Sequence, residues 1–217
     1  MKRSNPLNVM KFESDKLLLF TDLAGTLLLG IEGANEAISG NLDFLGVMVL
    51  AFATALAGGI IRDLLIGAVP PDSLQDWRYA AAAFLGGGMT FFMHHFVQAI
   101  PPNAIMILDA AGLAFLAVAG TQKALDYKMH PLIAVLLGTV TGVGGGALGE
   151  MMLARVPEVL RADIYATAAL VGAAAMVISR KFKMPATWAA LLGGTVCFLL
   201  RVISVWQHWN LPRLSGN

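Results

Sequence analysis

Residues 58–63 read GGIIRD and residues 144–150 read GGGALGE, and these two segments decide the fold that the sequence predicts. Both lie inside long apolar runs, where each glycine costs a helix about 1 kcal/mol relative to alanine. Paired glycines also favour a kink or an unwound turn. We therefore expect a broken helix at each segment, with the freed carbonyl oxygens turned toward the protein interior, because lipid cannot satisfy them.

The composition around these segments is typical of a membrane protein. Of the 217 residues, 57% are hydrophobic and 13% are charged, and the mean hydropathy is +0.70. Soluble domains are about 45–50% apolar and about 25% charged, so these values exclude a soluble globule and a disordered chain. A net charge of +1 with scattered basic residues predicts no nucleic-acid partner. The single cysteine, Cys197, excludes a disulfide framework.

Seven apolar runs approach the roughly 20 residues that a membrane-spanning helix needs. We expect an all-α membrane protein with one domain over residues 1–217. The predicted spans are Leu17–Gly33, Leu42–Gly59 with an extension to about Ala68, Tyr79–Ala99, Ala104–Thr121, Pro131–Ala154 with an internal break, Ile164–Ser179 and Pro185–Trp206. With Arg62 set aside as intramembrane, ten basic residues lie on the N-terminal side and four on the other side. This bias predicts a cytoplasmic N-terminus.

A second copy of the first half appears when the sequence is shifted by 87 residues. Asp22 falls on Asp109, residues 58–59 fall on residues 145–146, and Asp63 falls on Glu150, in one ungapped register over about 70 positions. The two copies cover about residues 17–99 and about residues 104–182, with three spans each. Since an odd number of crossings reverses direction, the copies form an inverted 3+3 repeat. The last span, at about residues 185–206, has no partner, and we expect it to serve peripheral packing or oligomer contacts.

Charged residues inside these apolar runs are the candidate functional residues, because an ionised side chain at the bilayer centre costs about 2.5–3.5 kcal/mol. Adjacent helical residues lie about 100° apart, so we expect Arg62 to pair not with Asp63 but with Glu150 from the inverted copy, as a gate. The candidate pore and ion-binding residues are Asp22, Thr26, Gly58, Gly59, Asp63, Asp109, Gly144, Gly145, Gly146 and Glu150.

Simpler interpretations of these residues stay open. Small residues also let helices approach closely without any break. Arg62, Asp63 and Glu150 would be solvated if they lay at the membrane surface. Asp22 or Asp109 would also favour the N-terminal turn of a helix.

The GGIIRD motif, its echo at residues 144–150 and the 3+3+1 plan of spans resemble the prokaryotic branch of the trimeric intracellular cation (TRIC) channels, whose bacterial members are also labelled glycine transporters. The resemblance covers roughly residues 17–205. It implies a homotrimer with a pore in each protomer, around the two glycine-containing helices. It also implies passive, mainly potassium-selective permeation of monovalent cations. Because the sequence resembles bacterial proteins and shows no organelle signal, we expect a location in the bacterial inner membrane. The second motif departs from the pattern, with Gly149 in the place of Arg62.

Three functions compete on the sequence alone. The first is a channel for potassium or sodium ions, surrounded by membrane lipid, in which carbonyl oxygens near the glycines replace part of the hydration shell of the ion. The second is a secondary transporter of a small zwitterion such as glycine, with half-helix N-termini binding the carboxylate. The third is a structural membrane protein without a pathway. The sequence predicts no catalytic residue, no cofactor and no metal beyond the permeating ions.

Overall fold

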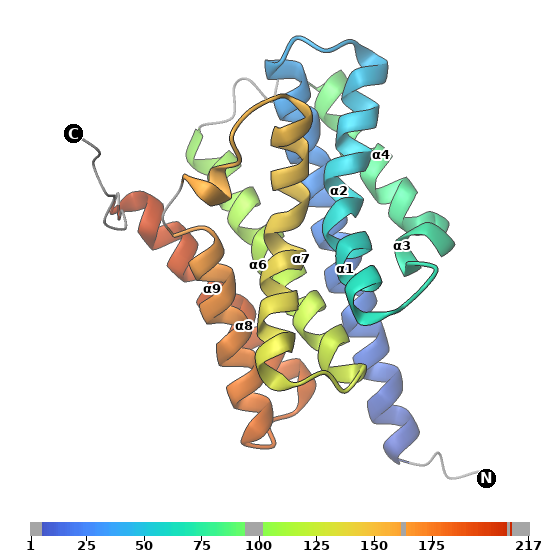
Figure 1. Ribbon diagram of the computed structural model, residues 1–217, viewed down its shortest axis with the longest axis vertical. Helices are drawn as coiled ribbons and strands as arrows, with labels where there is room; N and C mark the ends of the chain where they lie inside the picture. The colour runs from blue at the N-terminus through green and yellow to red at the C-terminus, as the bar shows by residue number, and fades with distance from the viewer. Residues whose placement is uncertain (1–5, 94–101, 162–163, 208, 210–217) are drawn as a thin grey trace.

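The computed structural model describes residues 6–93, 102–161, 164–207 and 209, and the described elements are helical (Figure 1). Two short elements, α3 (Asp72–Gln75) and the 3₁₀ helix η1 (Glu158–Leu160), accompany the long helices. The long helices are α1 (Pro6–Ser39), α2 (Phe44–Ile66), α4 (Trp77–Phe92), α6 (Pro102–Asp126), α7 (Pro131–Met152), α8 (Ala166–Lys181) and α9 (Ala186–Trp206).

The long helices follow the order of the predicted spans. Four of them, α2, α6, α7 and α9, are long and apolar enough to cross a membrane by themselves. At 1.5 Å per residue, the 34 residues of α1 extend about 50 Å, well beyond a hydrocarbon core of about 30 Å. The end of the predicted third span, from residue 94 to residue 99, lies outside the described residues. The count of seven spans therefore stays a prediction.

Local sequence sets where the helices start and stop. Asp43 caps α2 by accepting a hydrogen bond from the backbone N–H of Gly46. Gly67 ends the same helix with φ of 76°, a left-handed conformation that glycine adopts without a steric penalty. Asp76 caps α4 through the N–H of Arg78. Pro131 occupies the first turn of α7, where its missing N–H costs nothing.

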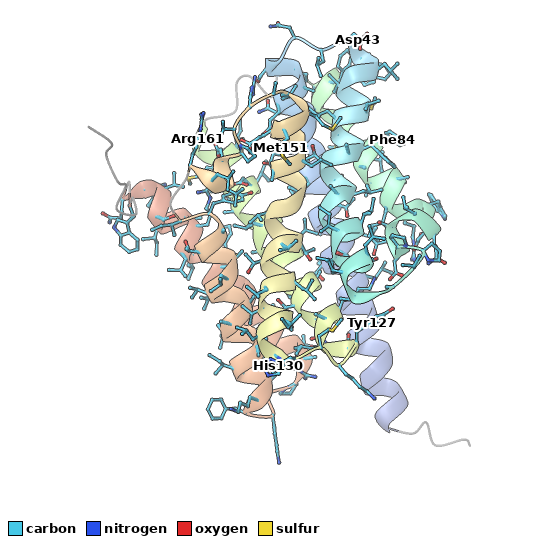
Figure 2. The ribbon with its side chains drawn as sticks, in the orientation of Figure 1. Asp43, Phe84, Tyr127, His130, Met151 and Arg161 are labelled. Atoms are coloured by element: carbon cyan, nitrogen blue, oxygen red, sulfur yellow. The ribbon has the colours of Figure 1, made fainter. Side chains whose placement is uncertain are left out.

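The two central helices, α2 and α7, run in opposite directions. Asp43, at the start of α2, and Met151, at the end of α7, are labelled at one end of the bundle, whereas His130, just before α7, lies at the other (Figure 2). We call these the Asp43 end and the His130 end. Helices α1, α2 and α4 form one unit and α6, α7 and α8 the other, and α9 packs against α6 and α8 (Figure 1).

The expected breaks in the second and fifth spans are wrong. Helix α2 is continuous through Gly58 and Gly59, and α7 is continuous through residues 144–146. The physical reason is close packing: a Cβ atom on Gly58 would collide with the carbonyl oxygen of Thr141. The glycines thus let two intact helices approach closely, and the carbonyls keep their helical hydrogen bonds instead of turning toward a pathway.

The contact between α2 and α7 is reciprocal. Gly58 lies against the carbonyl oxygen of Thr141, and Gly145 lies against the carbonyl oxygen of Thr54. The two glycines are 87 residues apart and so are the two threonines, which is the spacing of the sequence repeat. When two units are related by a two-fold axis, every contact between them occurs twice with the roles of the two units exchanged. The two glycine–threonine contacts have this relation.

The outer surface of the bundle is rich in large apolar side chains. Phe20 on α1, Leu85 and Phe92 on α4 and Leu191 on α9 are all more than half exposed. Large apolar side chains exposed on several helices are expected of a surface that faces lipid, because lipid tails are as apolar as these side chains. Of the charged residues that the sequence singled out, Asp22, Arg62 and Asp63 are buried, whereas Asp109 and Glu150 are half-buried.

Candidate functional site

The interior at the His130 end holds a buried ion pair between α1 and α2. Arg62 donates from Nη1 to Oδ1 of Asp22 at 3.1 Å and from Nη2 to Oδ2 at 3.2 Å, a bidentate arrangement. The hydroxyl of Tyr79, at the start of α4, donates to Oδ2 of Asp22 at 3.1 Å. The side chains of Arg62 and Asp22 are only 1% and 6% exposed. We call these three residues the Asp22 cluster.

Asp63 extends this cluster toward α3 and α6. It accepts from Nε of Arg62 at 2.8 Å and from Nζ of Lys123 at 2.8 Å, and its second oxygen accepts the backbone N–H of Asp72 at 3.0 Å. Lys123 also donates to the carboxylate of Asp72 at 2.7 Å. Each of these buried charges therefore has a partner, and ion pairs join elements of both repeats at the His130 end.

The predicted partner of Arg62 is wrong. Arg62 pairs with Asp22 and Asp63, whereas Glu150 lies with the residues at the Asp43 end and accepts the backbone N–H of Glu158 at 2.7 Å. The argument from helical angles failed because the Nε and the two terminal nitrogens of one guanidinium point in different directions. One arginine can therefore serve a neighbouring carboxylate and one on another helix together.

A second cluster surrounds Asp109 on α6, at the Asp43 end. The hydroxyl of Tyr165 donates to Oδ1 of Asp109 at 2.8 Å. Arg201 on α9 donates to Oδ2 from Nε at 3.3 Å and from Nη2 at 3.2 Å, and its guanidinium lies 4.4 Å from the centre of the Tyr165 ring. Oε2 of Glu158 is 3.9 Å from Nη2 of Arg201. We call Asp109, Tyr165 and Arg201 the Asp109 cluster.

The two clusters repeat one another with a small shift of register. Asp22 and Asp109 are 87 residues apart, as are Asp63 and Glu150. Tyr79 and Tyr165, which donate to the equivalent aspartates, are 86 residues apart. Asp72 and Glu158, which donate their backbone N–H to Asp63 and Glu150, are also 86 apart. The ungapped register expected from the sequence therefore loses one residue in the second copy, between residues 150 and 158.

The Asp43 end carries an excess of acidic groups. Glu32 and Glu36 on α1 lie with Glu150 and Glu158 around a small cavity of about 20 Å³, the size of one bound water or bare ion. Oε2 of Glu32 and Oε2 of Glu36 are buried and have no hydrogen-bond partner among the described residues. Glu36 stands 87 residues before Lys123, so the repeat places a carboxylate at one end where it places an ammonium at the other.

The other predicted site residues, Thr26, Gly59, Gly144 and Gly146, lie outside the ion-pair clusters. The hydroxyl of Thr26 donates to the backbone oxygen of Asp22 at 2.7 Å, one turn earlier on the same helix. Gly59 and Gly144 have room around them, since a Cβ on either would meet no atom closer than 3.5 Å. Gly146 lies under the carboxylate of Glu32, where a Cβ would be 3.4 Å from Oε1.

The sequence analysis did not single out Tyr79, Tyr165, Lys123, Arg201, Glu32 or Glu36. Arg201 carried a signal that was available: a single arginine inside an apolar span needs a partner, as Arg62 does. Lys123 and Glu36 were detectable as a charge reversal within the repeat. The tyrosines carried no such signal, because a tyrosine at the end of a span is common in any membrane protein.

Comparison with known families gives one match over most of the chain. A family model described as "Glycine transporter" matches residues 19–95 and again residues 106–181. The UPF0126 inner membrane protein YadS of Escherichia coli K12 is 32% identical over 200 residues, which cover 92% of this chain and 97% of that protein. The UPF0126 membrane protein SCO4104 of Streptomyces coelicolor is 42% identical over 196 residues, covering 90% and 89%.

Solved structures give a matching fold. A structure from work on conductance through TRIC cation channels superposes with a TM-score of 0.85 at 31% identity, covering 91% of this chain and 97% of that one. The TRIC trimeric intracellular cation channel orthologue from Rhodobacter sphaeroides gives a TM-score of 0.81 at 34% identity, covering 88% and 98%.

Proposed function

This chain belongs to the prokaryotic TRIC channel family, and from that premise we propose that it is a passive channel for monovalent cations, mainly potassium, in the bacterial inner membrane. Its solved relatives are described as cation channels, and the E. coli relative is named an inner membrane protein. We further propose a homotrimer in which each protomer has its own pore, with the exposed apolar side chains facing lipid or neighbouring protomers.

The observation that carries this proposal is the excess of half-buried carboxylates at the Asp43 end, where Oε2 of Glu32 and Oε2 of Glu36 are buried without a hydrogen-bond partner among the described residues. Glu32, Glu36 and Glu150 come from both repeats and surround one small cavity. A buried carboxylate without a partner is costly in a medium of low dielectric, and a cation at the cavity offsets that cost. Rings of acidic side chains are a usual device of cation channels. Cations are therefore the permeant class that this interior favours.

The proposed pathway runs between the two repeats, beside the crossing of α2 and α7. It leads from the acidic cavity, past residues 144–146, to the cluster of Asp22, Arg62 and Asp63. Because α2 and α7 are continuous, we propose that side chains, and not freed carbonyls, line it. Arg62 is the proposed gate at the His130 end, since its guanidinium occupies the carboxylates that would otherwise attract cations.

Single-channel recording tests this function. Purified protein in planar bilayers should give ohmic currents that reverse near the potassium equilibrium potential in a KCl gradient and are smaller in NaCl. Arg62→Ala should change open probability or conductance, and the exposed Arg180→Ala on α8 is the matched control. Absence of cation current from the wild-type protein would reject the channel, and unchanged currents in Arg62→Ala would remove Arg62 from gating. The mass of the intact complex, measured under native conditions, should equal that of three chains if the protein is a homotrimer.

A second candidate function is carriage of a small zwitterion such as glycine, which the description of the family model favours. Such a carrier was expected to bind the substrate carboxylate at half-helix N-termini, which the continuous α2 and α7 do not provide. Asp22 and Asp109, the expected partners of the ammonium group, are already paired with arginines. Liposomes loaded with unlabelled glycine separate the two functions: a carrier accelerates uptake of labelled glycine by exchange, whereas a channel does not.

A further inference from the structure

We propose that Arg201 on α9 is the counterpart of Arg62 in the second repeat, and that α9 thereby supplies a second gate at the Asp43 end. This inference rests on the proposed cation channel. It gives α9 a role in permeation, although α9 lies outside the repeat and the sequence predicted only packing or oligomer contacts for it.

The partners of the two arginines are equivalent. Arg62 donates to Asp22, which also accepts a hydroxyl from Tyr79. Arg201 donates to Asp109, which also accepts a hydroxyl from Tyr165. The two aspartates and the two tyrosines are repeat partners, so the inverted repeat has reproduced every member of the cluster except the arginine.

The arginine is missing from α7 for a steric reason. The residue 87 positions after Arg62 is Gly149, and a Cβ there would collide with Oγ1 of Thr54 on α2. An arginine at residue 149 would therefore force α2 and α7 apart at this contact. A guanidinium for Asp109 has to come from another helix, and α9 brings Arg201 within 3.2 Å of it.

The second ion pair is the looser of the two. Arg62 makes a bidentate contact with Asp22 and a further contact with Asp63, with all three side chains at most 6% exposed. Arg201 reaches a single oxygen of Asp109, and these side chains are 9% and 16% exposed. The carboxylate of Glu158, 66% exposed and 3.9 Å away, offers the guanidinium an alternative partner toward the surface.

The position of α9 allows this pair to open without disturbing the centre of the protein. Helix α9 packs on α6 and α8, on the outside of the bundle, and takes no part in the contact between α2 and α7 (Figure 1). A small displacement of α9 would carry Arg201 from Asp109 toward Glu158 and leave Asp109 free to attract a cation. Because the two clusters lie at opposite ends, a permeating ion has to pass both in series.

Recordings of arginine variants test this assignment. Wild-type protein, Arg201→Gln, Arg62→Gln and the double arginine variant are compared in planar bilayers in KCl, with Arg180→Gln on the surface of α8 as control. We expect Arg201→Gln to raise the open probability about fivefold or more, the scale on which site-to-site coupling acts. The double arginine variant should exceed both single variants, because two gates in series have to open together.

A second pair of variants separates gating from folding. The double variant Arg201→Gln with Asp109→Asn should conduct less than Arg201→Gln alone, because the freed carboxylate is gone. The melting temperature of each variant is measured as well. If Arg201→Gln acted through a folding defect, its melting temperature would fall, and adding Asp109→Asn would leave it low or lower it further. Arg201→Lys keeps the charge and should stay close to wild type. If the wild-type protein conducts and Arg201→Gln has the same open probability, Arg201 is not a gate, and the proposed channel function is unaffected. If neither the wild type nor any variant gives a cation current, the proposed channel function and the proposed gate are both rejected.

Discussion

Gly58 on α2 lies so close to the carbonyl oxygen of Thr141 on α7 that no side chain fits between them. The neighbouring Gly59 is different, because a Cβ there would meet nothing closer than Nη2 of Arg62, at 3.8 Å. The GGIIRD motif therefore contains one glycine that sets the distance between the two repeats and one that does not.

Alanine substitution should separate the two glycines. Gly58→Ala forces α2 and α7 apart, and overpacking of this kind costs about 1–3 kcal/mol, so we expect a lower melting temperature in detergent. Gly59→Ala should be neutral or stabilising by up to about 1 kcal/mol through helix propensity. Thermal unfolding followed by intrinsic tryptophan fluorescence measures both. Equal behaviour of the two variants would contradict the close contact.

The same test applies in the second repeat. Gly145→Ala would collide with the carbonyl oxygen of Thr54, whereas Gly144→Ala would lie at an ordinary distance of 3.5 Å from Cα of Gly58. We expect only Gly145→Ala to destabilise the protein, by about the same 1–3 kcal/mol. A kinked or unwound α7 would instead make Gly144→Ala and Gly145→Ala similarly disruptive, because both alanines would favour a straight helix.

Lys123 should stabilise the buried ion pairs at the His130 end. Lys123→Gln leaves Asp63 with one cationic partner instead of two, and breaking a buried pair typically costs about 3–5 kcal/mol. The combined Lys123→Gln and Asp63→Asn variant should recover part of this loss, because the carboxylate that stays without Lys123, that of Asp72, is half exposed to solvent. Chemical or thermal unfolding of the two single variants and the double variant gives the coupling energy.

A surface ion pair provides the control for Lys123. Asp76 and Arg78 contact one another at the start of α4, where Arg78 is exposed to solvent. The hydrogen bonds from Arg78 hold the pKa of the Asp76 carboxyl below its usual value. Arg78→Ala should leave the unfolding temperature unchanged, since exposed pairs contribute little. If Arg78→Ala lowered the unfolding temperature as much as Lys123→Gln, burial would not explain how strongly the interior ion pair stabilises the protein.

The sequence predicted the helical membrane fold and the repeat because both depend on properties that accumulate along the chain. Apolar runs add up over about 20 residues, and the repeat is visible at many positions at once. The partners of Arg62 depend on which helices touch, which one sequence does not reveal. A pair of glycines favours a break in an isolated helix and a close contact in a packed one, and only the facing carbonyl of Thr141 decides between them.

The charge difference between the two ends yields the last prediction. At the His130 end, Lys123 balances the carboxylates, whereas at the Asp43 end its repeat partner is Glu36, beside Glu32 and Glu150. We expect the acidic end to concentrate cations, so Glu32→Gln with Glu36→Gln should reduce inward and outward potassium currents unequally. The effect should be large at low ionic strength and fade near 1 M salt, where the Debye length falls to about 3 Å.

Asp43→Asn is the control for this charge effect. It removes one negative charge from an exposed side chain at the same end, and asparagine caps a helix about as well as aspartate, so α2 should stay intact. Single-channel current–voltage curves of the two variants are compared between about 20 mM and 1 M KCl. If Asp43→Asn lowers the current as much as the double glutamate variant, the general surface charge attracts the cations, and the half-buried carboxylates of Glu32 and Glu36 do not.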